Sequence, residues 1–154
     1  MGIGLAMFAA VPVAVLLLIF AYFAAWSYSG IFYSGDGDYR RGVDGAAWQV
    51  RFAPIDLSRP GRYTFHFSHL APPASYCAGL RIEGAAHPAA TVALTLRDER
   101  GDVVFAQKQR GEDCAAYFTP RWSERYTLTV EVIDADPVAG VRARPVLNGY
   151  TSGL

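Results

Sequence analysis

Three histidines are the first candidates for chemistry, because imidazole nitrogens bind transition metals. His66 and His69 lie three positions apart in a segment that alternates like a β-strand, and His87 follows later in the chain. In a strand, an odd offset places two side chains on opposite faces, so this pair is a poor chelate unless the chain turns between them. We therefore interpret the histidines as solvated and expect no metal or other cofactor.

Acidic residues offer a second metal-binding pattern, the Asp36-x-Asp38 pair. Ca²⁺ takes about six to eight oxygen ligands, and the further Asp or Glu positions of a known calcium loop are missing around this pair. A flexible acidic linker is the favoured interpretation. Glu112 and Asp113 are interpreted as part of a surface charge cluster, which contributes little to stability.

Nucleophilic catalysis needs a serine, cysteine or similar group that a neighbouring base activates. The sequence contains no G-x-S-x-G elbow and no glycine-rich phosphate loop between a strand and a helix. A triad can assemble from distant residues, so a hydrolase is the enzyme class that stays open. The sequence predicts a protein that is not an enzyme.

Cys77 and Cys114 are the two cysteines of the chain, and each is bordered by polar, loop-like sequence. An even count without C-x-x-C spacing is typical of one structural disulfide, which forms in an oxidising compartment. Closing a loop of about 37 residues would stabilise the fold by roughly 4 kcal/mol through chain entropy. The alternative is two unrelated buried thiols. We expect the disulfide.

Charge and aromatic content constrain the partners. Lys plus Arg and Asp plus Glu both number 14, and the basic residues are scattered, whereas nucleic-acid binding depends on clustered cations. We therefore expect no nucleic-acid partner. Exposed aromatic side chains in loops often anchor interfaces. Tyr117, Phe118 and Trp122, close to the expected disulfide, form the candidate partner surface, and burial in the core is the alternative for each.

The N-terminal segment indicates where the protein is located. No charged residue precedes Asp36, and residues 2–28 are apolar, aromatic or small. About twenty helical residues, at about 1.5 Å each, cross a hydrocarbon core of about 30 Å. Tyr22, Trp26 and Tyr28 suit the headgroup layer at its C-terminal end. A cleaved signal peptide is the alternative, but no Lys or Arg precedes the stretch. We predict an uncleaved anchor in the lipid bilayer.

Small residues recur at every fourth position of this anchor: Gly2, Ala6, Ala10 and Ala14. On a helix they form a smooth stripe that lets a second helix approach closely in lipid. The alternative is that alanine is simply common in this chain. Pro12 lies within the helix, where its missing N–H predicts a kink. These five residues form the predicted packing surface for a membrane-protein partner.

The orientation of the anchor rests on two opposing signals. Arg40 and Arg41 are the basic residues nearest to it, and the positive-inside rule then favours a cytoplasmic C-terminal domain. The expected disulfide favours an oxidising compartment instead. We side with the cysteines and predict a single-pass protein whose C-terminal domain is extracytoplasmic, in the periplasm.

After the anchor the chain alternates with a period of two, which indicates β-strands. The alternation covers 48–52, 63–67, 92–96 and 126–132, with turns between these ranges. Pro145 marks the later segment 141–147 as an edge strand or a loop. The predicted organisation has four parts: an anchor helix at 1–29, a linker at 30–45, a β-sandwich domain at 46–148 and a tail at 149–154. The fold class is mainly β, one transmembrane helix followed by one antiparallel sandwich of the jelly-roll or immunoglobulin-like kind.

The order of motifs within the sandwich resembles a known family. A Trp-led strand is followed by PGRYTFHF, TVALTLRDERGDVV and SERYTLTVEV. This order resembles the small β-sandwich modules related to bacterial pre-peptidase C-terminal domains, over about residues 48–132. The chain departs from the pattern around Cys77 and has no attached protease. The resemblance implies a non-catalytic module that supports binding or assembly.

Together these features predict a non-catalytic, membrane-anchored sandwich that acts as an accessory subunit or adaptor of a membrane protein assembly. One alternative is a membrane-tethered module that binds a carbohydrate or lipid. Another is a periplasmic immunity or inhibitor protein.

Overall fold

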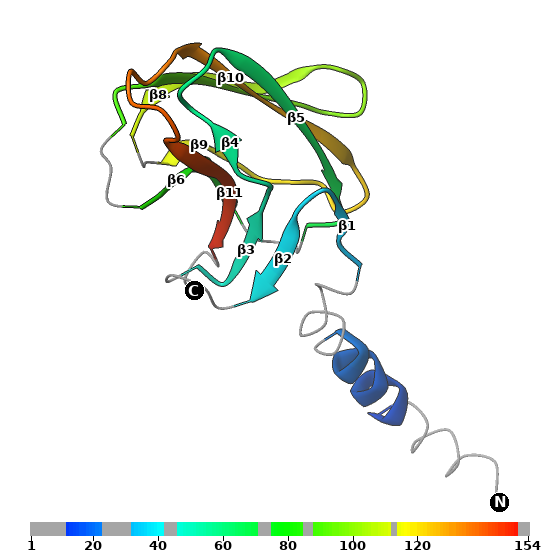
Figure 1. Ribbon diagram of the computed structural model, residues 1–154. Helices are drawn as coiled ribbons and strands as arrows, with labels where there is room; N and C mark the ends of the chain where they lie inside the picture. Colours follow the sequence, from blue (N-terminus) through cyan, green and yellow to red (C-terminus); the bar gives the residue numbers. More distant parts are fainter. Residues whose placement is uncertain are drawn as a thin grey trace, which may run out of the picture.

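The structure is a computed structural model that describes residues 12–22, 32–41, 46–70, 75–84, 88–111 and 114–150. Two antiparallel sheets pack face to face, which confirms a mainly β, sandwich-like fold (Figure 1). Sheet A runs in the order β1 (Ser34–Gly35), β5 (Gly61–Ser68), β10 (Arg125–Asp134), β7 (Thr91–Arg97), β8 (Val103–Arg110). Sheet B runs in the order β2 (Asp38–Arg41), β3 (Trp48–Arg51), β11 (Arg142–Tyr150), β6 (Ser75–Glu83), β9 (Cys114–Phe118), with β4 (Ile55–Asp56) also paired to β11.

The period-two pattern of the sequence corresponds to the inward faces of the two sheets. In β10, Tyr126, Leu128, Val130 and Val132 are buried, while the residues between them are partly exposed. The inward residues of β5, β7, β3 and β6 join them in one core cluster. Burying one large apolar side chain contributes roughly 1.5–3 kcal/mol, so burial of these inward side chains is the main contribution that holds the two sheets together.

The strands pair as nested arms around the hairpin of β7 and β8. Outside that hairpin β6 pairs with β9, then β5 with β10, and finally β3 and β4 with β11. Successive pairs alternate between the two sheets. As a result β10 lies between β5 and β7, and β11 lies between β3 and β6, so each sheet has a late segment of the chain at its centre.

The prediction that Pro145 marks an edge strand or loop is wrong, because β11 is paired on both sides. A proline cannot donate to a strand ladder, so it needs a gap in the neighbouring strand. That gap is the break between β3 and β4 at residues 52–54. The Pro145 carbonyl still accepts a hydrogen bond from Phe52 N at 3.0 Å.

The sandwich extends beyond the boundaries that the sequence predicts. Ser34–Gly35 adds β1 to sheet A, and Asp38–Arg41 adds β2 to sheet B, although both lie in the predicted linker. At the other end β11 continues to Tyr150, two residues into the predicted tail. Short polar segments become strands where an edge or a neighbouring strand supplies hydrogen-bond partners.

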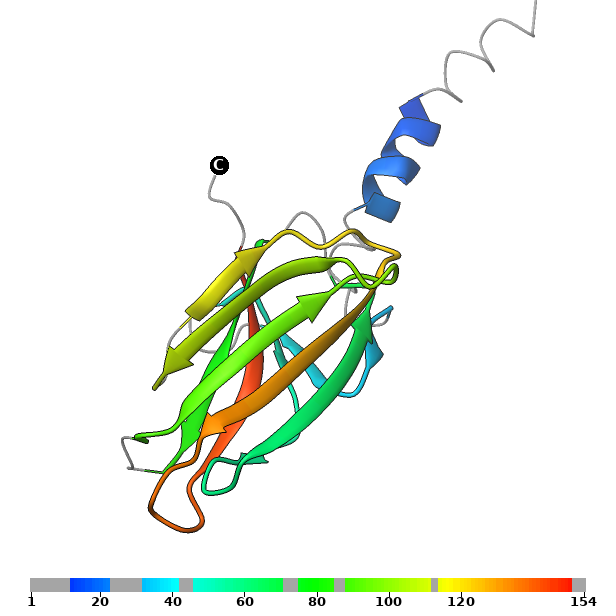
Figure 2. The ribbon, with the colours of Figure 1, turned by 90° about the horizontal axis from the view of Figure 1, so that it is seen from above.

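The first segment that the structure describes is a helix at 12–22, and every residue in it is exposed. Its large apolar side chains, from Val13 to Tyr22, are between 47% and 74% exposed. Among the described residues, no helix has both the length and the hydropathy needed to span a membrane. Figure 2 shows this helix outside the sandwich, beyond the end where β5 and β11 finish.

Candidate functional site

The candidate site is the end of the sandwich at which the chain enters from Phe32. We call this the proximal end and define it by the ends of β5 and β11, the start of β10 and the connections 98–102 and 119–124. Ser68 at the end of β5 faces both Ser34 of β1 and Arg125 of β10. The opposite, distal end holds the connections 57–60 and 135–141. In Figure 2 the connection from β9 to β10 crosses the proximal end from one sheet to the other.

Exposed apolar side chains are concentrated at the proximal end. Within the described part of the sandwich, eight large apolar side chains are exposed. Two of them, Ile133 and Val138, lie at the distal end. The other six lie at or next to the proximal end: Phe32, Val103, Val104, Tyr117, Trp122 and Tyr150. Exposed apolar side chains that gather in one region often mark an interaction site, so the proximal end is the candidate interaction surface.

Trp122 contacts two other rings at the proximal end. Its ring lies edge-on to Phe32, with 5.7 Å between ring centroids, and edge-on to His69 at 5.6 Å. On the sheet B side, the rings of Tyr117 and Tyr150 lie 6.4 Å apart. Aromatic rings with one apolar body and one polar tip suit a boundary between water and a less polar phase.

A buried hydrogen-bond network holds the connection that carries Trp122. The hydroxyl of Tyr126 donates to Glu124 Oε2 at 2.7 Å and accepts from Arg121 N at 3.0 Å. Glu124 also forms an ion pair with Arg121, at 3.7 Å. Burial, followed by the hydrogen bond to Glu124, raises the pKa of Tyr126 to about 12. The indole is therefore presented on a fixed turn.

The chain enters the sandwich through a second network, on β1. His66 N donates to Asp36 Oδ2 at 2.6 Å, and Asp36 N donates to the His66 carbonyl at 2.9 Å. The Tyr33 hydroxyl accepts from Gly37 N at 3.2 Å, and burial raises the pKa of Tyr33 to about 12. Gly35 has no space for a side chain, because a Cβ there would lie 2.6 Å from the His66 carbonyl oxygen. Phe32 is thus held close to the sheet.

An open groove of about 980 Å³ lies beside Trp122 on the outer side of sheet A. It is lined by β1, the end of β5, the start of β10 and residues 97–101. Both His66 and His69 line it, although a strand alone would separate them. The reason is that β5 ends at Ser68 and the chain turns at His69, whose φ is +56°. Histidine tolerates this left-handed conformation better than most residues. The sequence pattern alone does not predict a turn at this position.

The groove offers polar contacts rather than a recognisable catalytic arrangement. Ser68 Oγ lies 2.9 Å from His69 Nδ1, and His66 Nδ1 lies 3.2 Å from Thr127 Oγ1. A serine–histidine pair works as a nucleophile when a third group orients the imidazole. Here the other ring contact of His69 is Trp122. In the part of the chain that the structure describes, no three His, Cys, Asp or Glu side chains form a group that could hold a metal ion.

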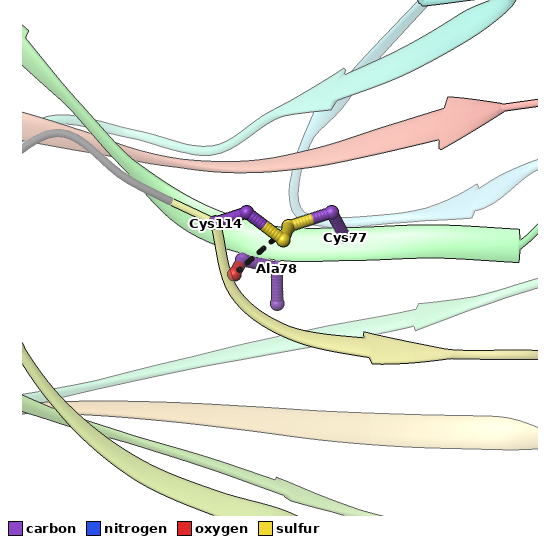
Figure 3. Close-up of a disulfide and its surroundings, with 3 residues drawn as sticks. All are labelled: Cys77, Ala78 and Cys114. Atoms are coloured by element: carbon purple, nitrogen blue, oxygen red, sulfur yellow. Dashed lines mark hydrogen bonds between the residues drawn. A yellow bond between two sulfur atoms is a disulfide. The ribbon is translucent and has the colours of Figure 1, made fainter.

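The expected disulfide is confirmed. Cys77 of β6 is joined to Cys114 of β9, with 5.6 Å between the Cα atoms (Figure 3). The bond runs diagonally across the strand pair, because Cys77 faces Tyr117 and Cys114 faces Gly79. The Cys77 sulfur is buried and lies 3.6 Å from the Ala78 carbonyl oxygen. The disulfide thus fixes the edge strand that ends in Tyr117 and Phe118.

The three predicted interface residues have different positions. Tyr117 is 65% exposed and Trp122 is 36% exposed, so both are available at the proximal end. For Phe118 the structure shows the alternative, burial in the core: it is 6% exposed and packs against Phe67, Tyr76, Phe105 and Tyr126. Its position at the end of β9 turns it inward, opposite Tyr76.

The predicted helix-packing residues are only partly within the description. Pro12 and Ala14 lie in the helix 12–22 and are exposed. Gly2, Ala6 and Ala10 lie outside the described residues, so the stripe and the kink stay predictions. Phe32, Val103, Val104 and Tyr150 are site residues that the sequence reasoning missed. Each adjoins a strand end, but only the strand pairing shows that these ends lie together.

Comparisons with known proteins give little more. No protein-family model matches the chain, and no curated protein matches it. It is similar to a solved structure described as the crystal structure of accessory secretory protein 1, 2 and 3 in Streptococcus pneumoniae, with 12% identity over 75% of this chain and 87% of that chain. The TM-score of 0.32 is too low to support an argument about fold or function.

Proposed function

We propose that this protein is a non-catalytic, single-pass membrane protein that presents its sandwich outside the cytoplasm and acts by binding, as an accessory subunit or adaptor of a membrane assembly. The observation that carries the proposal is the helix at 12–22, whose large apolar side chains are 47–74% exposed. A helix that is apolar on all sides and exposed to water is unfavourable, so it needs lipid or a partner around it.

The sequence around this helix supports a bilayer as its surroundings. Residues 2–28 contain no charged side chain, and the first one in the chain is Asp36. About twenty residues are enough to span the hydrocarbon core, and a helix satisfies its own backbone there. The stretch therefore has the length that an anchor needs.

The disulfide supports the extracytoplasmic location. Disulfides persist in oxidising compartments and are rare in the cytosol. The bond between Cys77 and Cys114 spans 37 positions and fixes an edge strand, which suits a domain that folds outside the cytoplasm. The periplasm is the compartment that we propose.

We further infer that the sandwich is a jelly roll. Its nested pairs alternate between two sheets of four principal strands, as expected for one long hairpin wound into two Greek keys. An immunoglobulin-like sandwich would pair its strands in a different order. A relation to pre-peptidase C-terminal modules remains part of this proposal, and it too implies binding rather than catalysis.

Membrane extraction tests the anchor. Wild-type protein should stay with membranes in urea and be released by detergent. Leu16→Arg combined with Leu17→Arg should shift the protein to the soluble fraction, because each arginine costs roughly 2.5–3.5 kcal/mol near the bilayer centre. The matched control is Leu16→Ile with Leu17→Ile, which should behave like wild type. Release of the wild-type protein by urea alone would overturn the anchor.

Thiol labelling of intact cells and spheroplasts tests the location. Cys77 and Cys114 should react with a membrane-impermeant maleimide in spheroplasts, and only after reduction. Free reaction of both thiols in the cytosol, without reductant, would show the proposed orientation to be wrong. Crosslinking followed by detergent pull-down tests the partner. Ala6→Leu with Ala10→Leu should lose a crosslinked membrane protein that the control Val13→Leu retains.

A second function, carbohydrate recognition, is favoured by one observation: the Trp122 ring contacts His69, which lines an open groove together with polar side chains of Arg97 and Thr127. Sugar rings stack on exposed aromatic side chains while polar groups bind their hydroxyls. Binding of the detergent-solubilised full chain to a glycan array, lost in Trp122→Ala but kept in Val138→Ala, would favour this function over the adaptor.

A further inference from the structure

We propose that the proximal end of the sandwich rests on the surface of the same bilayer that the N-terminal helix enters, with Trp122 in the headgroup layer. This inference rests on the proposed anchor and goes beyond it, because an anchored domain can also stand away from the membrane on its linker. The surface is defined by the exposed apolar residues at the proximal end: Phe32, Val103, Val104, Tyr117, Trp122 and Tyr150.

The first argument is the length of the chain between the anchor and the sandwich. The apolar stretch reaches Tyr28, and Phe32 follows four residues later. Four fully extended residues cover at most about 14 Å. Phe32 contacts Trp122 at 5.7 Å, and Ser34 is already paired with Ser68. Trp122 is therefore held within roughly 25 Å of Tyr28, the end of the apolar stretch, even on the longest path.

The same length excludes the distal end from the membrane. β5 runs eight residues from Gly61 at the distal end to Ser68 at the proximal end. At about 3.3 Å per residue this separates the two ends by more than 20 Å. Because β1 is paired to the proximal end of β5, the tether fixes which end faces the bilayer.

The second argument is the chemistry of the surface. Tryptophan and tyrosine favour the layer between water and hydrocarbon, where the ring body meets an apolar phase and the polar tip meets water. Trp122, Tyr117 and Tyr150 are exposed at this end, whereas the distal end exposes Ile133 and Val138. The bilayer also explains why Val103 and Val104 are exposed beside the same end.

The third argument is the charge around Trp122. In the sequence, Arg121 precedes Trp122 directly and Arg125 follows it three residues later. The Arg121 side chain is 74% exposed, although its ion-pair partner Glu124 is only 10% exposed. Guanidinium groups bind phosphate oxygens in pairs of hydrogen bonds. Two arginines near an indole in the sequence thus suit a surface of phosphate headgroups above hydrocarbon. A purely apolar protein surface would offer the arginines no phosphate to bind.

Fluorescence quenching by lipids tests the inference on the full chain. Trp26 is replaced by Phe to remove the tryptophan near the anchor, which leaves Trp122 and the buried Trp48. The protein is reconstituted in phosphatidylcholine vesicles that carry a shallow nitroxide quencher on the acyl chain. The Trp26→Phe protein should be quenched at least twofold more than a Trp26→Phe, Trp122→Phe control.

A distal reporter completes the design. Val138→Trp in the Trp26→Phe, Trp122→Phe background should show no more quenching than that background. Equal quenching at positions 122 and 138, or none at 122, would overturn the inference. Flotation of the vesicles separates the two proposals: protein that floats without quenching at 122 overturns the surface contact alone, whereas protein that does not float overturns the anchor itself.

Discussion

The guanidinium of Arg144 donates from Nη1 to the carbonyl oxygen of Phe52 at 3.3 Å, across the break between β3 and β4. Phe52 N donates to the Pro145 carbonyl, but Pro145 has no N–H to donate to the Phe52 carbonyl in return. The same guanidinium binds Glu83 at 2.8 Å and so links β6 to the break. Arg144 thus supplies the hydrogen bond that a proline at the centre of sheet B removes.

Removal of the Arg144 guanidinium should leave the Phe52 carbonyl without this hydrogen-bond donor. Arg144→Met should lower the free energy of unfolding by about 1–3 kcal/mol, because the Phe52 carbonyl loses its donor. Pro145→Ala restores a backbone N–H at that position, so the double variant should be more stable than Arg144→Met alone. Urea unfolding in detergent, followed by circular dichroism, measures both. Purely additive effects of the two substitutions would contradict the compensation.

Gly35 should be intolerant of a side chain. A Cβ there would lie 2.6 Å from the His66 carbonyl oxygen and 2.8 Å from Phe67 Cα, and backbone atoms cannot move aside without displacing β1. Gly35→Ala should therefore cost about 1–3 kcal/mol and raise the protease sensitivity near residue 33. Gly61→Ala is the matched control, since its nearest neighbour would be at 3.5 Å. Equal stability of the two variants would argue against a tightly packed β1.

Tyr126 should make stability depend on alkaline pH. Its pKa is raised to about 12 in the folded protein, mainly by burial and then by the bond to Glu124, from an ordinary value of about 10. The folded state therefore favours the neutral phenol. The stabilisation is complete below pH of about 10 and declines as the pH rises toward about 12.

Tyr126→Phe should weaken this decline, because the titrating group is gone. Tyr33, whose pKa is also raised to about 12, should account for part of the remainder. At neutral pH the variant should lose about 1–3 kcal/mol, since Glu124 loses a buried donor. Urea unfolding at several pH values and absorbance at the phenolate band measure the effect. The exposed Tyr150→Phe serves as the control, and an identical alkaline profile for wild type and Tyr126→Phe would rule out the assignment.

Loss of the disulfide should release β9. Replacing Cys77 and Cys114 by Ser should lower the free energy of unfolding by about 4 kcal/mol, because the cross-link closes a loop of 37 positions. Hydrogen exchange should rise first in β9, the edge strand that carries Tyr117. Reductant should have the same effect on wild type and none on the double variant. Unchanged stability on reduction would mean that the strand pairing alone holds this edge.

Much of the sandwich can be predicted from the sequence, since burial on one face of a strand imposes a period of two. Tyr126, Leu128, Val130 and Val132 follow this rule, and their strand is found where the pattern predicts it. The two strands between Ser34 and Arg41 escape prediction because they are short and polar. Their partners, not their own residues, make them strands.

The candidate site is harder to predict, because it joins parts of the chain that lie far apart. Phe32 meets Trp122 only after β1 pairs with the end of β5. Tyr117 and Phe118 are adjacent aromatic residues, yet one is exposed and the other is buried. A prediction that both residues lie in a loop treats them alike, whereas a strand directs adjacent side chains to opposite sides.

The central positions of β10 and β11 have a consequence for biosynthesis. Until these strands emerge, β3, β5, β6 and β7 present open backbone edges, which are templates for aggregation. A chain interrupted before Arg142 would leave sheet B divided into two separate pieces. Completion of the fold therefore waits until β11, the last strand of the chain, has been synthesised.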